Sequence, residues 1–147
     1  MSKHESTEVR ELMRAAVTGH DATAMREAVG RLFGPGPAAL SPEAEYEVRH
    51  PDYVMEMPQS GERIRGREAM RRMQEEYPAP PTIQVHRVTG SGPVWVLEGV
   101  NDYGGEIWYV VAVLELDQEG RILHDTRYYG RPFPPEPTRA ALVEPMD

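Results

Sequence analysis

The stretch that decides the fold is Met57-Pro-Gln-Ser-Gly-Glu-Arg-Ile-Arg-Gly-Arg-Glu-Ala-Met70. It predicts the end of one strand, a turn at Ser60-Gly61, a short second strand and the start of a helix at Gly66. A strand pair that runs straight into a helix is an unusual order in so small a chain. The segments on either side of it complete the architecture.

Two amphipathic helices are predicted near the N-terminus. Ser6 or Thr7 can cap the first, which ends at Gly19, and Asp21 caps the second, which ends at Gly34-Pro35. Apolar residues recur at helical spacing in both: Val9, Leu12, Met13, Ala16 and Val17, then Met25, Ala28, Val29, Leu32 and Phe33.

A short third helix and six strands follow. The helix begins at Ser41-Pro42-Glu43, and His50-Pro51 breaks it. After that point the apolar residues recur at every second position, as they do in strands. The exception is a helix at Arg67–Tyr77 that Pro78 ends. The strands are expected at 53–57, 62–65, 82–89, 93–103, 106–117 and 121–129. This order predicts one α+β domain over residues 1–147, with helices packed on one face of a curved antiparallel sheet.

The composition excludes several kinds of partner. The chain has 24 acidic and 16 basic residues, a formal net charge of -8, which argues against nucleic acid and anionic membrane. It has no cysteine, so disulfides and thiolate metal sites are excluded. The histidines and carboxylates lack metal-ligand spacing, and no glycine-rich phosphate loop is present. We expect no metal, no cofactor and a cytoplasmic location.

One strand is apolar on both faces. Ile107-Trp-Tyr-Val-Val-Ala-Val-Leu114 does not alternate as a strand with one wet face should. Helices can cover only one face, so a second copy of the chain is expected on the other, in contact with Tyr109, Val111 and Val113. The alternative is that the C-terminal tail, with Pro132-Phe-Pro-Pro-Glu-Pro137, folds back over that face.

Four motifs add a family resemblance to this element order: 59–68, Val94-Trp-Val-Leu-Glu98, Gly120-Arg-Ile122 and Arg127-Tyr-Tyr-Gly-Arg-Pro-Phe133. The chain resembles the nuclear transport factor 2-like superfamily, most closely its SnoaL-like branch, which includes ketosteroid isomerase, limonene epoxide hydrolase and polyketide cyclases. The resemblance implies a cone-shaped fold with a hydrophobic pocket, and homodimers are common in the family.

The catalytic groups of the two best-known relatives are absent from this chain. At the isomerase positions stand Met57 for the base, Ala112 for the oxyanion-hole acid, and Leu12 or Met13 for the tyrosine. At the epoxide hydrolase positions stand Gly99, Asn101 and Arg127. The resemblance therefore implies the scaffold without either catalytic apparatus.

The same alignment implies which side chains point into the cone. The catalytic candidates are Asp125, Arg127 and Tyr129, which alternate along one strand and so share a face. Arg127 would bind an anionic or carbonyl oxygen, Asp125 would orient it or act as a base, and Tyr129 would donate a hydrogen bond. We expect Arg127 to pair with Asp125 in the empty protein. The expected ligand-binding residues are Met55, Met57, Trp95, Leu97, Asn101, Trp108, Val110 and Ala112.

Three functions remain open. The first is a cofactor-independent cyclase, isomerase, dehydratase or hydrolase acting on a small hydrophobic oxygenated molecule. The second is a non-catalytic small-molecule binder, and the third is a dimeric interaction module with a filled cone. A structural ion pair is the alternative to a functional Asp125–Arg127 patch. His86 and His124 are weaker candidates because no adjacent Ser, Cys or acid motif supports them.

Overall fold

The computed structural model describes residues 2–33, 40–76 and 82–146. Its helices are α1 (Ser2–Gly19), α2 (Ala22–Phe33), α3 (Pro42–Val48) and α4 (Arg67–Glu76). Its strands are β1 (Arg49–Met57), β2 (Glu62–Arg65), β3 (Thr82–Ser91), β4 (Val94–Tyr103), β5 (Glu106–Leu116) and β6 (Ile122–Gly130), followed by a 3-10 helix, η1 (Pro137–Leu142). The predicted α+β order is confirmed.

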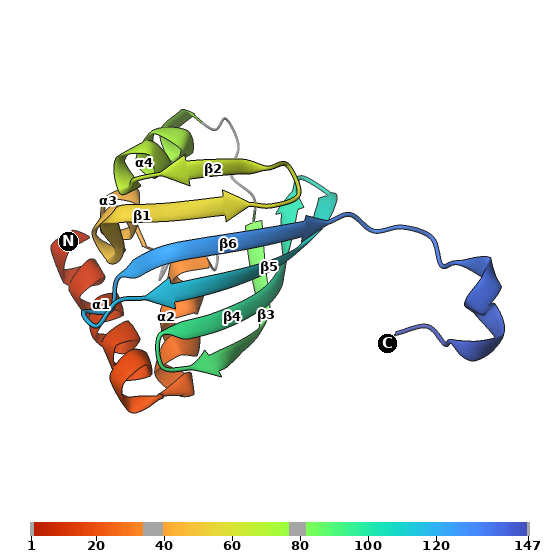
Figure 1. Ribbon diagram of the computed structural model, residues 1–147, viewed down its shortest axis with the longest axis horizontal. Helices are drawn as coiled ribbons and strands as arrows, with labels where there is room; N and C mark the ends of the chain where they lie inside the picture. Colours follow the sequence, from red (N-terminus) through yellow and green to blue (C-terminus); the bar gives the residue numbers. More distant parts are fainter. Residues whose placement is uncertain (1, 34–39, 77–81, 147) are drawn as a thin grey trace.

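The six strands form one curved sheet in the order β2-β1-β6-β5-β4-β3, with α1 and α2 on one of its faces (Figure 1). All neighbouring pairs are antiparallel except β1 and β6, which run parallel with Met55 opposite Asp125. The predicted curved antiparallel sheet is confirmed, with this one parallel pair as an exception that the sequence did not indicate. A parallel pair needs a long crossover, and the segment from β2 to β5 provides it.

Local sequence signals placed most element ends. The hydroxyl of Ser41 accepts a hydrogen bond from the backbone N–H of Ala44, and a carboxylate oxygen of Asp21 accepts one from Ala24, as the predicted caps require. The bounds predicted for β2 are confirmed. The predicted ends at Gly34-Pro35 and at Tyr77-Pro78 lie outside the described residues.

Two element starts differ from the prediction by several residues. Helix α1 begins at Ser2, so Ser6 is not a cap but lies within the helix and is buried. Strand β1 begins at Arg49 and contains Pro51. Proline fits there because the β1–β6 pairing passes from Arg49 directly to Val54, so Pro51 removes no hydrogen bond from that ladder.

The core lies between the two N-terminal helices and the inner face of the sheet. Val9, Met13, Met25 and Val29 are fully buried from the helix side. From the sheet side the buried residues are Tyr53, Met55, Trp95, Leu97, Ala112 and Leu114. The predicted inward direction of alternate residues on β4 and β5 is thus confirmed. None of the helices in the described part of the chain is long and apolar enough to cross a membrane.

The chain beyond β6 leaves the sheet. Residues 131–146, which we call the C-terminal arm, extend away from the body of the molecule and contain η1 (Figure 1). All sixteen are exposed. The alternative that the tail folds back over the outer face of the sheet is therefore wrong.

Candidate functional site

A buried ion pair lies on the inner face of β6. Arg127 donates from Nε and Nη2 to the carboxylate of Asp125, with an Nη2–Oδ2 distance of 2.8 Å. The Asp125 side chain is 1% exposed and that of Arg127 is 14% exposed. The predicted pairing of Arg127 with Asp125 is confirmed.

Tyr53 on β1 completes this cluster. Its hydroxyl donates to Oδ2 of Asp125 at 2.9 Å, across the parallel strand pair. The carboxylate therefore accepts hydrogen bonds from both a phenol and a guanidinium, which offsets the cost of burying its charge. The ring of Phe33, from the end of α2, lies 5.5 Å from the Arg127 guanidinium carbon and covers the cation.

The electrostatics of the cluster follow from this arrangement. Burial raises the pKa of Tyr53 strongly, and the neighbouring Asp125 carboxylate raises it further, so the phenol stays protonated as a donor. Burial is the largest single effect and lowers the pKa of Arg127, but Asp125, Tyr53 and Tyr129 together outweigh it and hold that pKa well above its ordinary value. Arg127 is therefore a permanent cation at the centre of the cluster.

A second carboxylate lies close to the same cation. Burial raises the pKa of Glu45 on α3, although Arg49, a hydrogen bond from Gln74 and the charge of Arg127 all oppose that rise. The Gln74 amide nitrogen is 2.9 Å from Oε2 of Glu45. Arg49 is 2% exposed and lies over the Tyr53 ring, with its Nε unpartnered among the described residues.

A small cavity lies in front of Arg127. Its volume is about 20 Å³, and it is lined by Phe33, Ile83, Leu97, Asn101, Val110, Ala112 and Arg127. A space of this size holds roughly one water molecule, whereas ligand pockets usually measure several hundred cubic ångströms. Oδ1 of Asn101 is buried there without a hydrogen-bond partner in the described part of the chain.

The predicted site residues separate into two groups. Leu97, Asn101, Val110, Ala112 and Arg127 meet at the cavity. The others lie elsewhere. Met55 and Trp95 are core residues, and the Trp95 indole N–H donates to the carbonyl of Gly92. Met57 and Tyr129 are partly buried outside the cavity lining, and Trp108 packs against Arg131.

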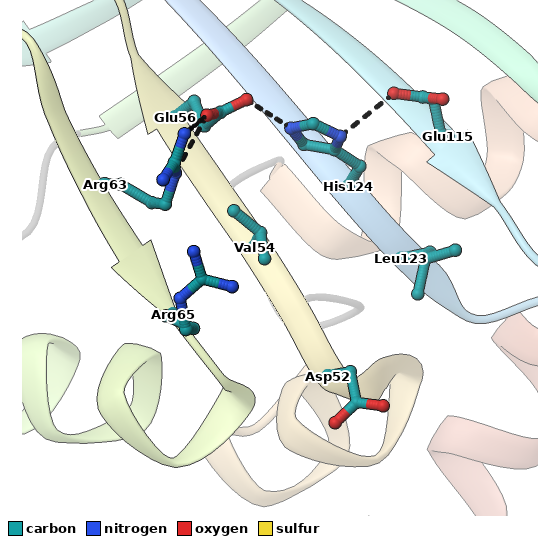
Figure 2. A pocket seen from close by; sticks show the side chains of 8 residues that line it. All are labelled: Asp52, Val54, Glu56, Arg63, Arg65, Glu115, Leu123 and His124. Atoms are coloured by element: carbon teal, nitrogen blue, oxygen red, sulfur yellow. Dashed lines mark hydrogen bonds and ion pairs between the residues drawn. The ribbon is translucent and has the colours of Figure 1, made fainter.

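A larger hollow lies on the opposite face of the sheet. This groove has a volume of about 350 Å³ and is lined by Asp52, Val54, Glu56, Arg63, Arg65, Glu115, Leu123 and His124 (Figure 2). His124 bridges Glu56, at 2.6 Å from Nε2, and Glu115, at 3.2 Å from Nδ1. Both ring nitrogens are engaged by carboxylates, so neither is free to act on a ligand.

Sequence reasoning missed Tyr53, Glu45, Arg49 and Phe33 in the inner cluster, and Glu56 and Glu115 around His124. Tyr53 shares the inward parity of Met55 on β1, so alternation could have indicated its direction. Its contact with Asp125 depends on the parallel pairing, which no local signal indicates. In the described ranges, no group of three or more His, Asp or Glu side chains could hold a metal ion.

The comparisons with known proteins show which fold the chain has. No protein-family model and no curated protein sequence matches the chain. Among solved structures, an NTF-2 like protein of unknown function from Burkholderia xenovorans matches with a TM-score of 0.66 and 25% identity, over 100% of this chain and 99% of the other.

Two further structures extend this likeness. A provisionally assigned ketosteroid isomerase from Kribbella flavida has a TM-score of 0.66 and 25% identity, over 95% of this chain and 90% of the other. An LEH-like epoxide hydrolase from M. tuberculosis shares the fold at a TM-score of 0.53 and 18% identity, over 86% and 84%. The strand order, the helix-covered face and these matches together show that the chain has the nuclear transport factor 2-like fold and is similar to ketosteroid isomerase-like proteins of that fold.

Proposed function

We propose that the protein binds a small, mainly apolar molecule that carries one oxygen, and that Arg127 and Asn101 hold this oxygen. The observation that carries the proposal is the polar end of the inner cavity. Arg127 uses Nε and Nη2 on Asp125, which leaves Nη1 without a partner among the described residues. Asn101 offers a buried Oδ1 that lacks a donor in the same part of the chain.

The two groups together favour a hydroxyl. A hydroxyl accepts from the guanidinium and donates to the amide oxygen, so it satisfies both at once. A ketone could satisfy only Arg127 and would leave Oδ1 of Asn101 buried without a donor, at a cost of about 1–3 kcal/mol. Alcohols or enols are therefore the preferred chemical class, ahead of ketones of the same shape.

The cavity volume limits the size of the ligand. About 20 Å³ accommodates the hydroxyl oxygen but little else. A ligand with an apolar body requires a change of side-chain position in the lining, and Phe33, which covers Arg127, is the large side chain best placed to move. Replacing Phe33 by Ala should open the cavity and strengthen binding.

Calorimetric titration of the full chain with matched small alcohols, ketones and alkanes tests the proposal. We expect alcohols to bind best, Phe33→Ala to bind them more tightly, and Asn101→Leu to weaken alcohols while leaving ketones unchanged. The control for general loosening is Val85→Ala, which trims a side chain packed on the core outside the cavity lining. Failure of every probe to bind Phe33→Ala would overturn the proposal.

A catalytic role is the second candidate, and Glu45 favours it. Asp125 is fully occupied by Tyr53 and Arg127, so it is poorly placed to accept a proton from a ligand. Glu45 has a raised pKa and lies within electrostatic range of Arg127. Such a carboxyl suits acid–base work in a cofactor-independent isomerase, dehydratase or hydrolase. Turnover of any bound alcohol that Glu45→Gln abolishes without weakening binding would establish this role.

The third candidate, a dimeric interaction module with a filled cone, is favoured by the small volume of the inner cavity. It predicts that no small molecule binds either the native chain or the Phe33→Ala variant. The same titrations therefore separate it from the ligand-binding proposal.

A further inference from the structure

The C-terminal arm exposes large apolar side chains to water. Phe133 is 79% exposed, Leu142 is 88% exposed and Met146 is 98% exposed. Within the described residues, only Arg131 ties the arm to the body, through an ion pair with Glu106 and a contact with the ring of Trp108. Large apolar side chains that their own chain leaves this exposed indicate a surface that another molecule covers.

The arm is also stiff. Five of its residues are proline: Pro132, Pro134, Pro135, Pro137 and Pro145. Proline fixes the backbone and favours an extended course of roughly 3.1 Å per residue, so residues 131–136 reach about 19 Å beyond the sheet. Because few backbone states are available to the arm, little conformational entropy is lost when it binds.

The outer face of the sheet carries a matching apolar surface. Alternate residues of β4, β5 and β6 form an outer patch, and Tyr109 at 54% exposed, Val111 at 37% and Tyr128 at 45% lie at its centre. The other members of the outer patch are Val96, Val100 and Val113, which the register between β4 and β5 places beside these residues. The outward direction predicted for Tyr109, Val111 and Val113 is confirmed.

The groove continues this face toward the start of β6. Val54 and Leu123 form its apolar part, and Leu123 is 39% exposed. Arg63 and His124 are engaged with Glu56, but the side chains of Asp52 and Arg65 have no partner among the described residues (Figure 2). The groove therefore presents one uncompensated carboxylate and one uncompensated guanidinium beside apolar side chains.

The arm and the groove lie at opposite ends of the same strand. The groove contains Leu123 and His124 at the start of β6, and the arm leaves after Gly130 at its end (Figure 1). If two copies pack outer patch to outer patch with their β6 strands antiparallel, the end of one β6 lies over the start of the other. That arrangement is a two-fold dimer in which each arm begins beside the partner's groove.

We propose that two copies of this chain exchange their C-terminal arms, each arm docking in the groove on the outer sheet face of the other copy. Leu142 would pack on Val54 and Leu123 of the second copy. Charge complementarity supports the same occupant. Arg139 of the arm can pair with Asp52 of the groove, and Glu144 of the arm can pair with Arg65 of the groove. The exchange covers both apolar surfaces at once and adds the arms to the sheet–sheet contact.

The mass of the full chain in solution gives the first test. Sedimentation should give a dimer at micromolar concentration. Leu142→Asp should weaken dimerisation at least tenfold, because it places a charge in the apolar part of the groove. Thr138→Asp, an exposed polar position of the same 3-10 helix, is the matched control and should change the dimer constant less than threefold. A monomer, or a dimer that Leu142→Asp leaves unchanged, would overturn the proposal.

Cross-linking decides between exchange and any other path of the arm. The chain has no cysteine, so single cysteines can be introduced without background. Mixing Leu142→Cys with Leu123→Cys chains under oxidation should give a heterodimeric disulfide, and Leu142→Cys with the exposed Thr89→Cys on β3 should not. A chain carrying both Leu142→Cys and Leu123→Cys that closes only within itself would refute exchange. So would equal cross-linking to Thr89→Cys.

Discussion

Asp125 is the residue on which the inner cluster depends, because its carboxylate is almost fully removed from water. From the sequence alone, Arg127→Met is expected to abolish ligand binding while leaving the fold intact, since methionine keeps much of the apolar stem. In the structure it would leave the Asp125 charge with only the Tyr53 hydroxyl as partner among the described residues. Removing one member of a buried pair costs about 3–5 kcal/mol, whereas removing both charges costs much less.

We therefore expect Arg127→Met to lower the free energy of unfolding by about 3–5 kcal/mol, and Asp125→Asn with Arg127→Met to recover a large part of that loss. Urea unfolding of the two single variants, the double variant and the native chain completes the cycle. Strictly additive losses would mean that the two charges do not interact, contrary to their 2.8 Å contact.

Glu45 gives a prediction about pH. Burial raises its pKa above the ordinary 4.5, so the folded chain holds this proton more tightly than the unfolded chain does. The associated stability is complete below pH 4.5 and is lost as the pH rises through the folded-state pKa. Glu45→Gln cannot ionise, so its stability relative to the native chain should increase from about pH 4 towards neutral pH. Denaturant unfolding at several pH values measures this difference.

The control for that experiment is Glu43→Gln, which removes an equal charge from the exposed surface of the same helix. Subtracting its effect corrects for the change in net charge. A Glu45→Gln advantage that shrinks with rising pH would contradict the assignment of the raised pKa to burial.

Some of the inner site could be predicted residue by residue and some could not. Alternation along β6 placed Asp125 and Arg127 on one face, the family resemblance implied that this face points inward, and their spacing made the ion pair predictable. Tyr53 was missed because it reaches Asp125 from a strand 72 positions away in sequence. Glu45 was missed because its burial depends on the packing of α3 against α4, which no local pattern encodes.

At the scale of elements, the turn between β5 and β6 is held directly against α1. A Cβ on Gly120 would lie 2.3 Å from the carbonyl oxygen of Arg10 and 2.8 Å from the backbone nitrogen of Arg14. Gly120 also has φ of +76°, which disfavours any side chain. This glycine lets the sheet and the first helix meet backbone to backbone.

Gly120→Ala should be markedly destabilising, by well over the roughly 1–2 kcal/mol that the left-handed backbone alone costs. Gly104→Ala is the matched control, since Gly104 has φ of +68° but nothing within 4 Å of the added Cβ. Thermal unfolding of both variants separates the backbone cost from the clash with α1. Equal losses would show that α1 can move away from the turn at little cost.

The type of an element could be predicted where the sequence signal was local. The ends of an element could not be predicted where tertiary contacts override the local signal. Ser41 caps α3 as its sequence indicates, and the glycine pair at Gly104-Gly105 turns the chain between β4 and β5. The extra turn at the start of α1 was not predicted, because its residues are polar and show no apolar helical pattern. Strand β1 continues through Pro51 because its pairing skips that position.

For the molecule as a whole, the shared scaffold does not bring the relatives' chemistry with it. We expect no steroid isomerase and no limonene epoxide hydrolase activity, because Met57 and Ala112 replace acids of the first, and Gly99 and Asn101 replace an arginine and an aspartate of the second. Each positioned acid or base is typically worth about 10²–10⁴ in rate. Product analysis with either substrate checks this, and turnover that Arg127→Met abolishes would contradict it.

The parallel contact between β1 and β6 has a consequence for how the chain is made. A ribosome delivers β1, β2 and α4 long before β6, so the edge of β1 that β6 will occupy has no partner while β3, β4 and β5 are being synthesised. The sheet can close only when the last strand emerges and inserts between β1 and β5. Nascent chains stalled before Ile122 should therefore be protease-sensitive and bound by chaperones, and the native fold should appear in one late step.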